Sequence, residues 1–341
     1  MTERPILVSA ELSRKLANMS VIAALMVVVL HAGGVASHGS SGWWLQRLAT
    51  QVCKSAVPFF FLASGFFLVG RWGKAGWYRQ AVSRRMRTLV LPYFIWCALW
   101  CCYFIPVCCR HGGFADFLSA HAWAFFGLDV LRPPFYSVAW YLRSLFFFVL
   151  ISPVLVSFVR RFRWCAVGVL YLADLAFRIV PNSGGGLVFG VFHYVFSLEG
   201  AAYFVLGLGL RLGVLGRPRL PKLPFMLGMM VVLIGCNTIL YWKGIMPWMS
   251  FEGFVIPVVI AVLWAMVSDA AWPSWMTTAS FPLYMIHPFV LALLTSFVFH
   301  TTDSAVFFVL KVVAAIAISM VAISLFRRLM PRVASVMFGG R

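Results

Sequence analysis

Long apolar stretches dominate this chain and are separated by short polar or arginine-rich breaks. A helix needs about 20 mostly apolar residues to cross the hydrocarbon core of a bilayer, and such runs recur from end to end. Alternating polarity typical of transmembrane β-strands is absent. The pattern predicts an all-α bundle that crosses a membrane about ten times. The predicted spans are 16–34, 51–70, 88–108, 137–159, 164–181, 188–210, 224–242, 251–268, 279–299 and 305–326.

Composition supports a polytopic integral membrane protein. Of the 341 residues, 62% are hydrophobic and 11% charged, whereas roughly a quarter of a soluble domain is charged. The stretch 109–136 is the longest break, and no other break has room for a soluble domain. The first apolar run lacks a small-x-small cleavage pattern, so we expect it to be retained as a helix. Residues 1–341 are therefore expected to form a single transmembrane domain.

The net charge of +19 reflects topology. The N-terminal segment, the C-terminal tail and the breaks after even-numbered spans hold 20 of the 28 lysines and arginines. Basic residues accumulate in cytoplasmic loops, so both termini are predicted to be cytoplasmic. Binding of nucleic acid usually requires a basic patch on a folded surface, and we expect no nucleic-acid partner.

Ionisable side chains inside the predicted spans are candidate functional groups, because each is costly in lipid unless it is paired or faces a cavity. Those within spans are His31, Arg143, His193, Glu199, His287 and Lys311, and Asp174 and Glu252 lie near span ends. The eight cysteines show no metal-ligand spacing with histidines, so we expect them to be small buried residues and predict no metal site.

His31 ends the apolar run "ALMVVVLHAGG", at the non-cytoplasmic end of the first span. Gly33 and Gly34 follow it and allow another chain or a ligand to approach the ring closely. A neutral imidazole can take a proton from a hydroxyl at physiological pH. On its own, His31 fits either a general base or a histidine hydrogen-bonded at a helix end.

His287 lies in "SFPLYMIHPFV", next to Pro288. A proline removes one backbone donor and frees the carbonyl one turn earlier, which here is that of Tyr284. His287 is therefore expected to satisfy the backbone at a kink. Taken alone, it favours a structural role over a catalytic one.

Arg84 and Arg87 lie three residues apart where "SRRMRTLVLPYF" enters the third span, so they are predicted to share a helix face. Paired guanidiniums suit phosphate, because each can donate two parallel hydrogen bonds. Without further information, the pair is more typical of basic anchors at a membrane surface.

Two further stretches carry polar residues. In "FFFLASGFFL", Ser64 and Gly65 favour close helix packing over a nucleophilic role for the serine. In "AWYLRSLFFF", Arg143 requires a carboxylate or carbonyl partner. No P-loop, dinucleotide fingerprint, H-E-x-x-H motif or nucleophile elbow is present, which disfavours ATP-driven transport, dinucleotide chemistry and zinc proteolysis.

The order of these motifs resembles the acyltransferase-3 family of integral membrane acyltransferases, whose core has ten membrane helices. The matching stretches, in the first four spans and the ninth, are "AALMVVVLHAGG", "VPFFFLASGFFL", "RRMRTLVLPYFIW", "WYLRSLFFFVLISPVL" and "SFPLYMIHPFV". The resemblance covers nearly the whole chain. It implies transfer of an acyl group, usually acetyl, from cytoplasmic acyl-coenzyme A to a hydroxyl or amine of a glycan or lipid-linked sugar at the outer face of a bacterial inner membrane.

The resemblance also implies roles for individual residues. It makes His31 the catalytic residue and places Arg84 and Arg87 at the donor, which reverses the anchor interpretation of that pair. His31 would act as general base or carry the acyl group itself. The family commonly has an arginine eleven residues before this histidine, and that position here is Ser20.

Other side chains have less defined roles. Glu199 or Glu252 is a candidate to orient the His31 imidazole, and Tyr284 and His287 are candidates to line the path through the membrane. The main alternative is a transporter or flippase of a lipid-linked sugar, although we find no internal repeat of the kind typical of transporters. Membrane-bound O-acyltransferases of the other large class are usually longer, with the histidine towards the C-terminal half. A purely structural subunit fits the buried polar residues least.

Overall fold

The computed structural model describes residues 5–33, 36–110, 136–179, 191–216, 218–244 and 252–340. Every regular element within these ranges is helical, which confirms the all-α prediction. Gly34 and residues 111–135 of the long break lie outside the described residues. The elements of the first half are α1 (Ala10–Ala32), α2 (Ser41–Cys53), α3 (Ala56–Leu68), η1 (Val69–Arg71), α4 (Trp77–Arg85), the π-turn η2 (Met86–Val90), α5 (Leu91–Arg110), η3 (Ser137–Ala139), α7 (Trp140–Leu150) and α8 (Ser152–Phe162).

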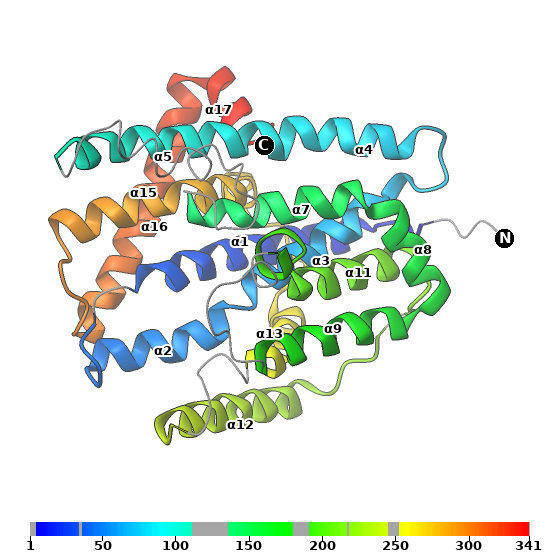
Figure 1. Ribbon diagram of the computed structural model, residues 1–341, viewed down its shortest axis with the longest axis horizontal. Helices are drawn as coiled ribbons and strands as arrows, with labels where there is room; N and C mark the ends of the chain where they lie inside the picture. The colour runs from blue at the N-terminus through cyan, green and yellow to red at the C-terminus, as the bar shows by residue number, and fades with distance from the viewer. Residues whose placement is uncertain are drawn as a thin grey trace.

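The second half continues the same bundle. Its elements are α9 (Trp164–Ile179), the π-turn η4 (Val191–Val195), α11 (Leu198–Leu212), α12 (Leu223–Trp242), α13 (Glu252–Met266), α14 (Ser274–Thr277), α15 (Ser280–Phe297), α16 (Ala305–Leu329) and α17 (Pro331–Met337). Most of the long helices run roughly along one common direction (Figure 1).

Within the described ranges, six helical segments are long and apolar enough to cross a membrane, or seven if the bent pair α7–α8 is one span. Each of the ten predicted spans contains a described helix. The three that do not reach this length and hydropathy correspond to α9, α11 and α13, which have 16, 15 and 15 residues.

Some boundaries differ from the predicted spans for local reasons. Helix α1 begins at Ala10 because the Ser9 hydroxyl accepts a hydrogen bond from the Leu12 amide at 3.1 Å, which caps the first turn. The predicted span 137–159 is bent by 70° between α7 and α8. Pro153 lies in the first turn of α8, where its missing amide costs no intrahelical hydrogen bond.

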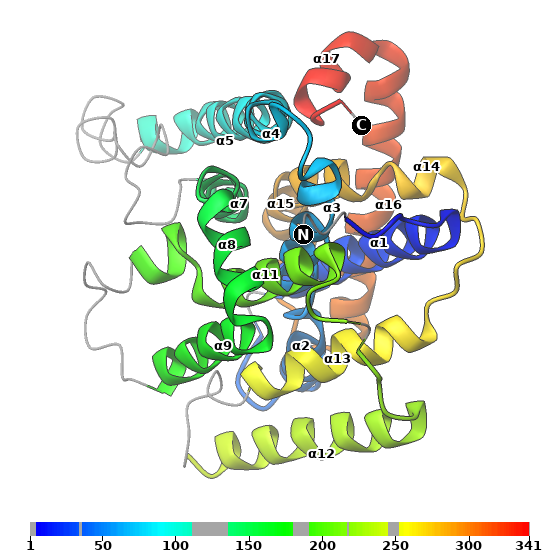
Figure 2. The same cartoon turned by 90° about the vertical axis from the view of Figure 1, so that its right-hand side faces the viewer.

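Helix α1 occupies the centre of the bundle and packs against α2, α3, α15 and α16. Figures 1 and 2 show these helices around α1 from two directions. Helices α3 and α11 come close through two glycines: a Cβ at Gly65 would clash with the Phe204 carbonyl oxygen, and one at Gly207 with the Leu62 carbonyl oxygen. Gly65 therefore permits the close packing that the sequence predicts.

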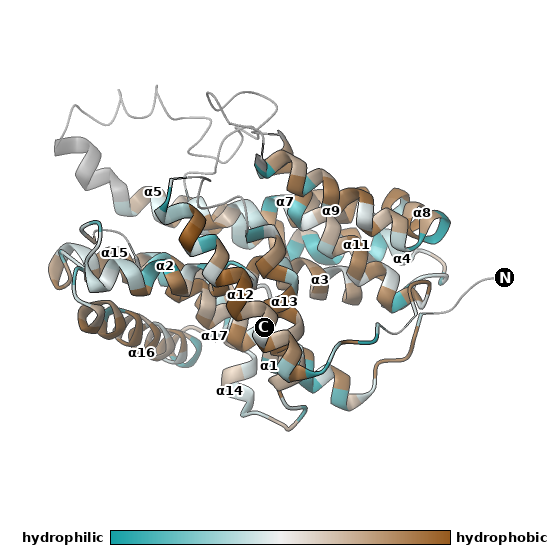
Figure 3. Cartoon of the chain, turned by 90° about the horizontal axis from the view of Figure 1, so that it is seen from below, coloured by the Kyte–Doolittle hydropathy of each residue, from teal (hydrophilic) through white to brown (hydrophobic). Residues whose placement is uncertain are grey.

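Helices α12 and α16 present apolar side chains outward. Figure 3 shows both as predominantly hydrophobic. The large exposed side chains include Phe225, Val231, Val232, Ile239 and Trp242 on α12, and Val306, Phe307, Val313, Val321 and Leu325 on α16. Surfaces of this kind are unfavourable in water and suit contact with lipid chains.

Candidate active site

The structure brings together two histidines that lie 256 residues apart in the chain. His31 is in the last turn of α1, and His287 is near the middle of α15, which packs against α1. Their ring centres are 5.1 Å apart, and His287 Nε2 lies 3.3 Å from His31 Nδ1. The two histidines, each predicted to lie inside an apolar span, therefore form one pair.

The backbone carbonyls beside Pro288 in α15 fix the tautomer of His287. Pro288 cannot donate to the Tyr284 carbonyl, and the His287 Nδ1–H donates to that oxygen at 2.8 Å. The Leu283 carbonyl oxygen lies 3.2 Å from the same nitrogen. Because Nδ1 must carry the proton to satisfy these carbonyls, Nε2 of the neutral ring is an acceptor. The predicted role at the backbone is confirmed, and the ring also points its free nitrogen at His31.

The same reasoning sets the tautomer of His31. Its Nδ1 lies between the Val27 carbonyl oxygen, at 2.9 Å, and His287 Nε2. Both neighbours are acceptors, so Nδ1 carries the proton and Nε2 keeps a lone pair. The His31 side chain is exposed, whereas His287 is fully buried. The pair thus leaves Nε2 of the exposed His31 residue with a lone pair that can accept a proton.

Aromatic side chains extend from the histidine pair into the bundle. The ring centres of His287 and Tyr284 are 6.1 Å apart, and those of Tyr284 and Tyr141 are 5.7 Å apart. The Tyr141 hydroxyl lies 3.2 Å from Ser64 Oγ. The structure therefore connects Ser64, Tyr284 and His287. Tyr141 was not predicted, although its position beside Trp140 in a quoted motif was an available signal.

Two tyrosine hydroxyls connect α15 with the segment before α7. The Tyr284 hydroxyl donates to the Val138 carbonyl oxygen, and the Tyr136 hydroxyl donates to the Met285 carbonyl oxygen. All of these groups are buried. The reciprocal bonds fix α15 one turn before His287, and so they hold its ring against His31.

Gly33 was expected to let another part of the chain or a ligand approach closely, and the structure places the Gln46 side chain there. A Cβ at Gly33 would clash with the side-chain amide of Gln46 on α2, so a larger residue at this position would displace that side chain. The Gln46 side chain therefore lies against Gly33 at the end of α1, and Gly33 is two residues after His31 in the sequence. The close neighbour at this glycine is another part of the chain.

The expectation that Glu199 or Glu252 orients His31 is wrong. Arg178 Nη2 contacts Glu199 Oε2 at 2.9 Å, and Lys54 Nζ contacts Glu252 Oε2 at 2.6 Å. These carboxylates belong to a separate ionic cluster, in which Arg178 Nη1 also lies 3.8 Å from Glu252. A fixed guanidinium is a stronger electrostatic partner for a carboxylate than a neutral imidazole, so the acidic residues gather around Arg178.

The remaining predicted polar residues lie apart from the pair. Asp174 joins the ionic cluster through Arg178 Nε at 2.8 Å, and the two residues lie four positions apart along α9. His193 stacks on Trp140 with ring centres 5.6 Å apart. Arg143 is half-buried on α7 and hydrogen-bonds to Tyr93 of α5. Lys311 is buried on α16.

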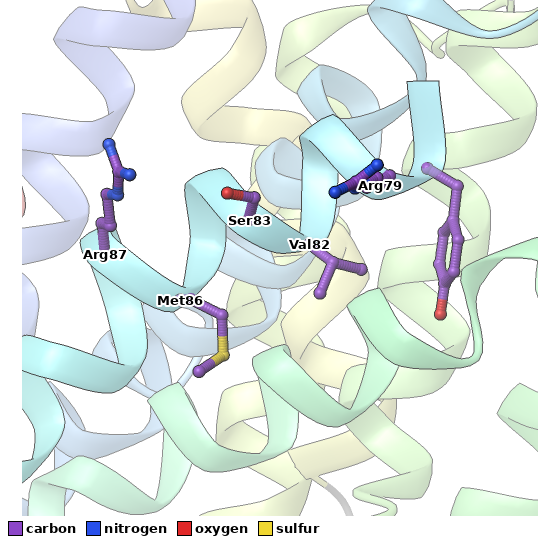
Figure 4. A pocket seen from close by; sticks show the side chains of 6 residues that line it. Arg79, Val82, Ser83, Met86 and Arg87 are labelled. Carbon is purple, nitrogen blue, oxygen red and sulfur yellow. The ribbon is translucent and has the colours of Figure 1, made fainter. Parts of the chain in front are cut away.

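A shallow hollow of about 460 Å³ lies along α4 and η2. It is lined by Tyr78, Arg79, Val82, Ser83, Met86 and Arg87. Figure 4 shows Ser83 and Arg87 on one side of the helix, and Val82 and Met86 on the other. Arg87 shares the hollow with Arg79, whereas Arg84 is exposed and lies outside the lining.

Comparison with known proteins gives one clear match. The model of the acyltransferase 3 family, described as an acyltransferase domain, matches residues 18–324. This range includes every residue of the histidine pair, the aromatic connection and the hollow. No curated protein and no solved structure matches the chain.

Proposed function

The chain belongs to the acyltransferase 3 family of membrane-bound acyltransferases, and we propose that it moves an acyl group, in the first instance acetyl, from acyl-coenzyme A in the cytoplasm to a hydroxyl or amine at the outer face. The acceptor is a glycan or a lipid-linked sugar. The resemblance of the motifs to that family supports these substrates and a bacterial inner membrane as the location.

The positions of the basic segments support the proposed orientation. The N-terminus, the start of α4, the connection between α8 and α9, and the connection between α11 and α12 lie at the same end of the molecule (Figure 1). These segments carry most of the lysines and arginines, and we assign this end to the cytoplasm. Counting α9, α11 and α13 as spans gives ten crossings with both termini in the cytoplasm. His31 is then at the outer end of α1.

The proposed mechanism depends on the tautomers of the histidine pair, which leave Nε2 of His31 as the base. His31 Nε2 takes the proton of the acceptor hydroxyl while that oxygen attacks the thioester carbonyl. The C–S bond breaks, and the departing sulfur of coenzyme A takes the proton back from His31. Nδ1–H of the transient imidazolium donates to His287 Nε2 and the Val27 carbonyl oxygen, which stabilises the charge. His287 acts as a positioning residue.

The donor enters from the basic end. Arg87 and Arg79 in the hollow supply guanidiniums for its phosphates, with Arg84 beside them. We propose that the acyl arm reaches His31 past Ser64, Tyr141 and Tyr284. These three side chains form the contacts that connect α3, α7 and α15.

The test uses the purified protein in nanodiscs with radiolabelled acetyl-coenzyme A and a glycolipid extract as acceptor. We expect label in the extract and release of free coenzyme A. Label that accumulates on wild-type protein and is lost in His31→Ala would show a covalent acyl-histidine step. Movement of lipid-linked sugar between leaflets without consumption of donor would refute acyl transfer and support the flippase alternative.

A further inference from the structure

Arg211 has buried guanidinium nitrogens that the proposed mechanism does not use. It lies in the last turn of α11, and its guanidinium carbon is 5.3 Å from the centre of the Phe66 ring on α3. A Cβ at Gly70 would be 3.4 Å from Arg211 Nη2. Nε and Nη1 are both buried and have no hydrogen-bond acceptor among the described residues. The side chain is therefore folded against the end of α3.

This arrangement differs from that of an ordinary arginine at a helix end. A cation in the last turn is favoured by the helix dipole, and its long stem normally extends so that the charged group reaches water. Here the protein covers two of the three nitrogens. Burying charged N–H groups without an acceptor is unfavourable, so the two buried nitrogens point to an anionic ligand that accepts their hydrogen bonds. No carboxylate in the described part of the chain pairs with Arg211.

Arg211 lies at one end of a series of basic residues that leads to the hollow. We call Arg211, Arg71, Arg79 and Arg87 the basic strip. Gly70 precedes Arg71, whose Nη1 donates to Gln80 Oε1 at 3.0 Å. Gln80 is next to Arg79, which lines the hollow with Arg87. The N-terminal segment lies beside the end of α11, because the Ile6 amide donates to the Arg211 carbonyl oxygen at 2.9 Å. Arg71 precedes α4, and α4 starts at the end assigned to the cytoplasm (Figure 1).

We propose that Arg211 binds a phosphate group of the acyl donor and is a further donor-binding residue beside Arg79 and Arg87. The proposal rests on the proposed function, because acyl-coenzyme A carries a pyrophosphate and a separate ribose phosphate. Guanidiniums spaced along a strip can bind such separated phosphates, each through parallel N–H donors. The phosphate of an anionic lipid in the same leaflet offers the same chemistry from another source.

The experiment measures binding of acetyl-coenzyme A to the full-length protein in nanodiscs of neutral phosphatidylcholine. The variants are Arg211→Gln, Arg211→Lys and, as a matched control, Arg161→Gln, an exposed arginine of α8. A second arm measures thermal stability with inorganic phosphate, and a third adds phosphatidylglycerol to the nanodiscs. The stability of each variant without ligand is measured as well.

We expect Arg211→Gln to weaken binding of acetyl-coenzyme A roughly 10- to 100-fold, Arg211→Lys less, and Arg161→Gln less than twofold. Without ligand, Arg211→Gln should be at least as stable as wild type, because it removes a charge whose buried N–H groups have no hydrogen-bond acceptor among the described residues. A structural role would instead lower that stability.

Unchanged donor affinity in Arg211→Gln would overturn the inference while leaving the proposed function intact. If wild type binds no acetyl-coenzyme A, the proposed donor is refuted. In that case, stabilisation by phosphate or phosphatidylglycerol that disappears in Arg211→Gln supports a phosphate site and overturns the donor as its source. Absence of an Arg211-dependent effect in every arm overturns the site itself.

Discussion

His287 offers a sharp test, because its two nitrogens have different partners. Nδ1 donates to the Tyr284 carbonyl oxygen at 2.8 Å, and Nε2 faces His31 at 3.3 Å. The amide of asparagine reaches the position of Nδ1, whereas the amide of glutamine reaches that of Nε2. His287→Asn therefore keeps a donor for the backbone and loses the contact with His31. His287→Gln keeps the acceptor for His31 and loses the donor to the Tyr284 carbonyl oxygen.

The expected magnitudes follow from these contacts. A hydrogen bond to a charged group contributes about 1.5–3 kcal/mol, and each 1.36 kcal/mol changes a rate tenfold. Losing the acceptor for the His31 imidazolium should therefore lower kcat about 10- to 100-fold in His287→Asn. Leaving the buried Tyr284 carbonyl without a donor costs about 1–3 kcal/mol. His287→Gln should consequently be less stable but remain within about fivefold of wild-type kcat.

The assay compares initial rates of label transfer from acetyl-coenzyme A with the thermal unfolding of each variant in nanodiscs. The KM for the donor should stay near the wild-type value in both variants, since neither nitrogen contacts the basic strip. The opposite pattern, with an active His287→Asn and an inactive His287→Gln, would refute the tautomer argument. Equal loss of rate in both, in proportion to the loss of stability, would reduce His287 to a structural residue.

Three further predictions follow from other parts of the structure. Glu252→Ala should lower the free energy of unfolding by about 3–5 kcal/mol, because Lys54 loses its buried partner, and thermal unfolding that matches wild type would contradict this. Gly65→Val should lower the unfolding temperature by separating α3 from α11, as measured by tryptophan fluorescence on heating, whereas wild-type stability would show that the helices adjust. Arg87→Gln should raise the KM for acetyl-coenzyme A about tenfold or more and Arg84→Gln less; equal effects would contradict the assignment of Arg87 to the hollow.

Much of the architecture could be predicted from the sequence, because a bilayer requires each spanning helix to be long and apolar. All ten predicted spans contain helices, yet their ends depend on local chemistry such as the cap at Ser9 and the bend before Pro153. Hydropathy changes little at these positions.

The site was only partly predictable. Ionisable residues within apolar runs identified His31 and His287, because their cost in lipid requires an explanation. Their mutual contact spans 256 residues, and no local pattern encodes a pairing at that distance. Glu199 was assigned to the wrong partner for the same reason. Asp174 and Arg178 lie four apart on one helix, and that spacing could have revealed the ionic cluster.

The most direct test of the central claim is the rate of acyl transfer by His31→Ala, measured beside donor affinity in the same nanodiscs. His300→Ala is the matched control, because His300 is an exposed histidine in the connection after α15. Removing a general base typically lowers the rate about 10²- to 10⁴-fold. We predict a loss of that size in His31→Ala, with unchanged affinity for acetyl-coenzyme A and a wild-type rate in His300→Ala. Transfer at the wild-type rate by His31→Ala would contradict the proposed mechanism.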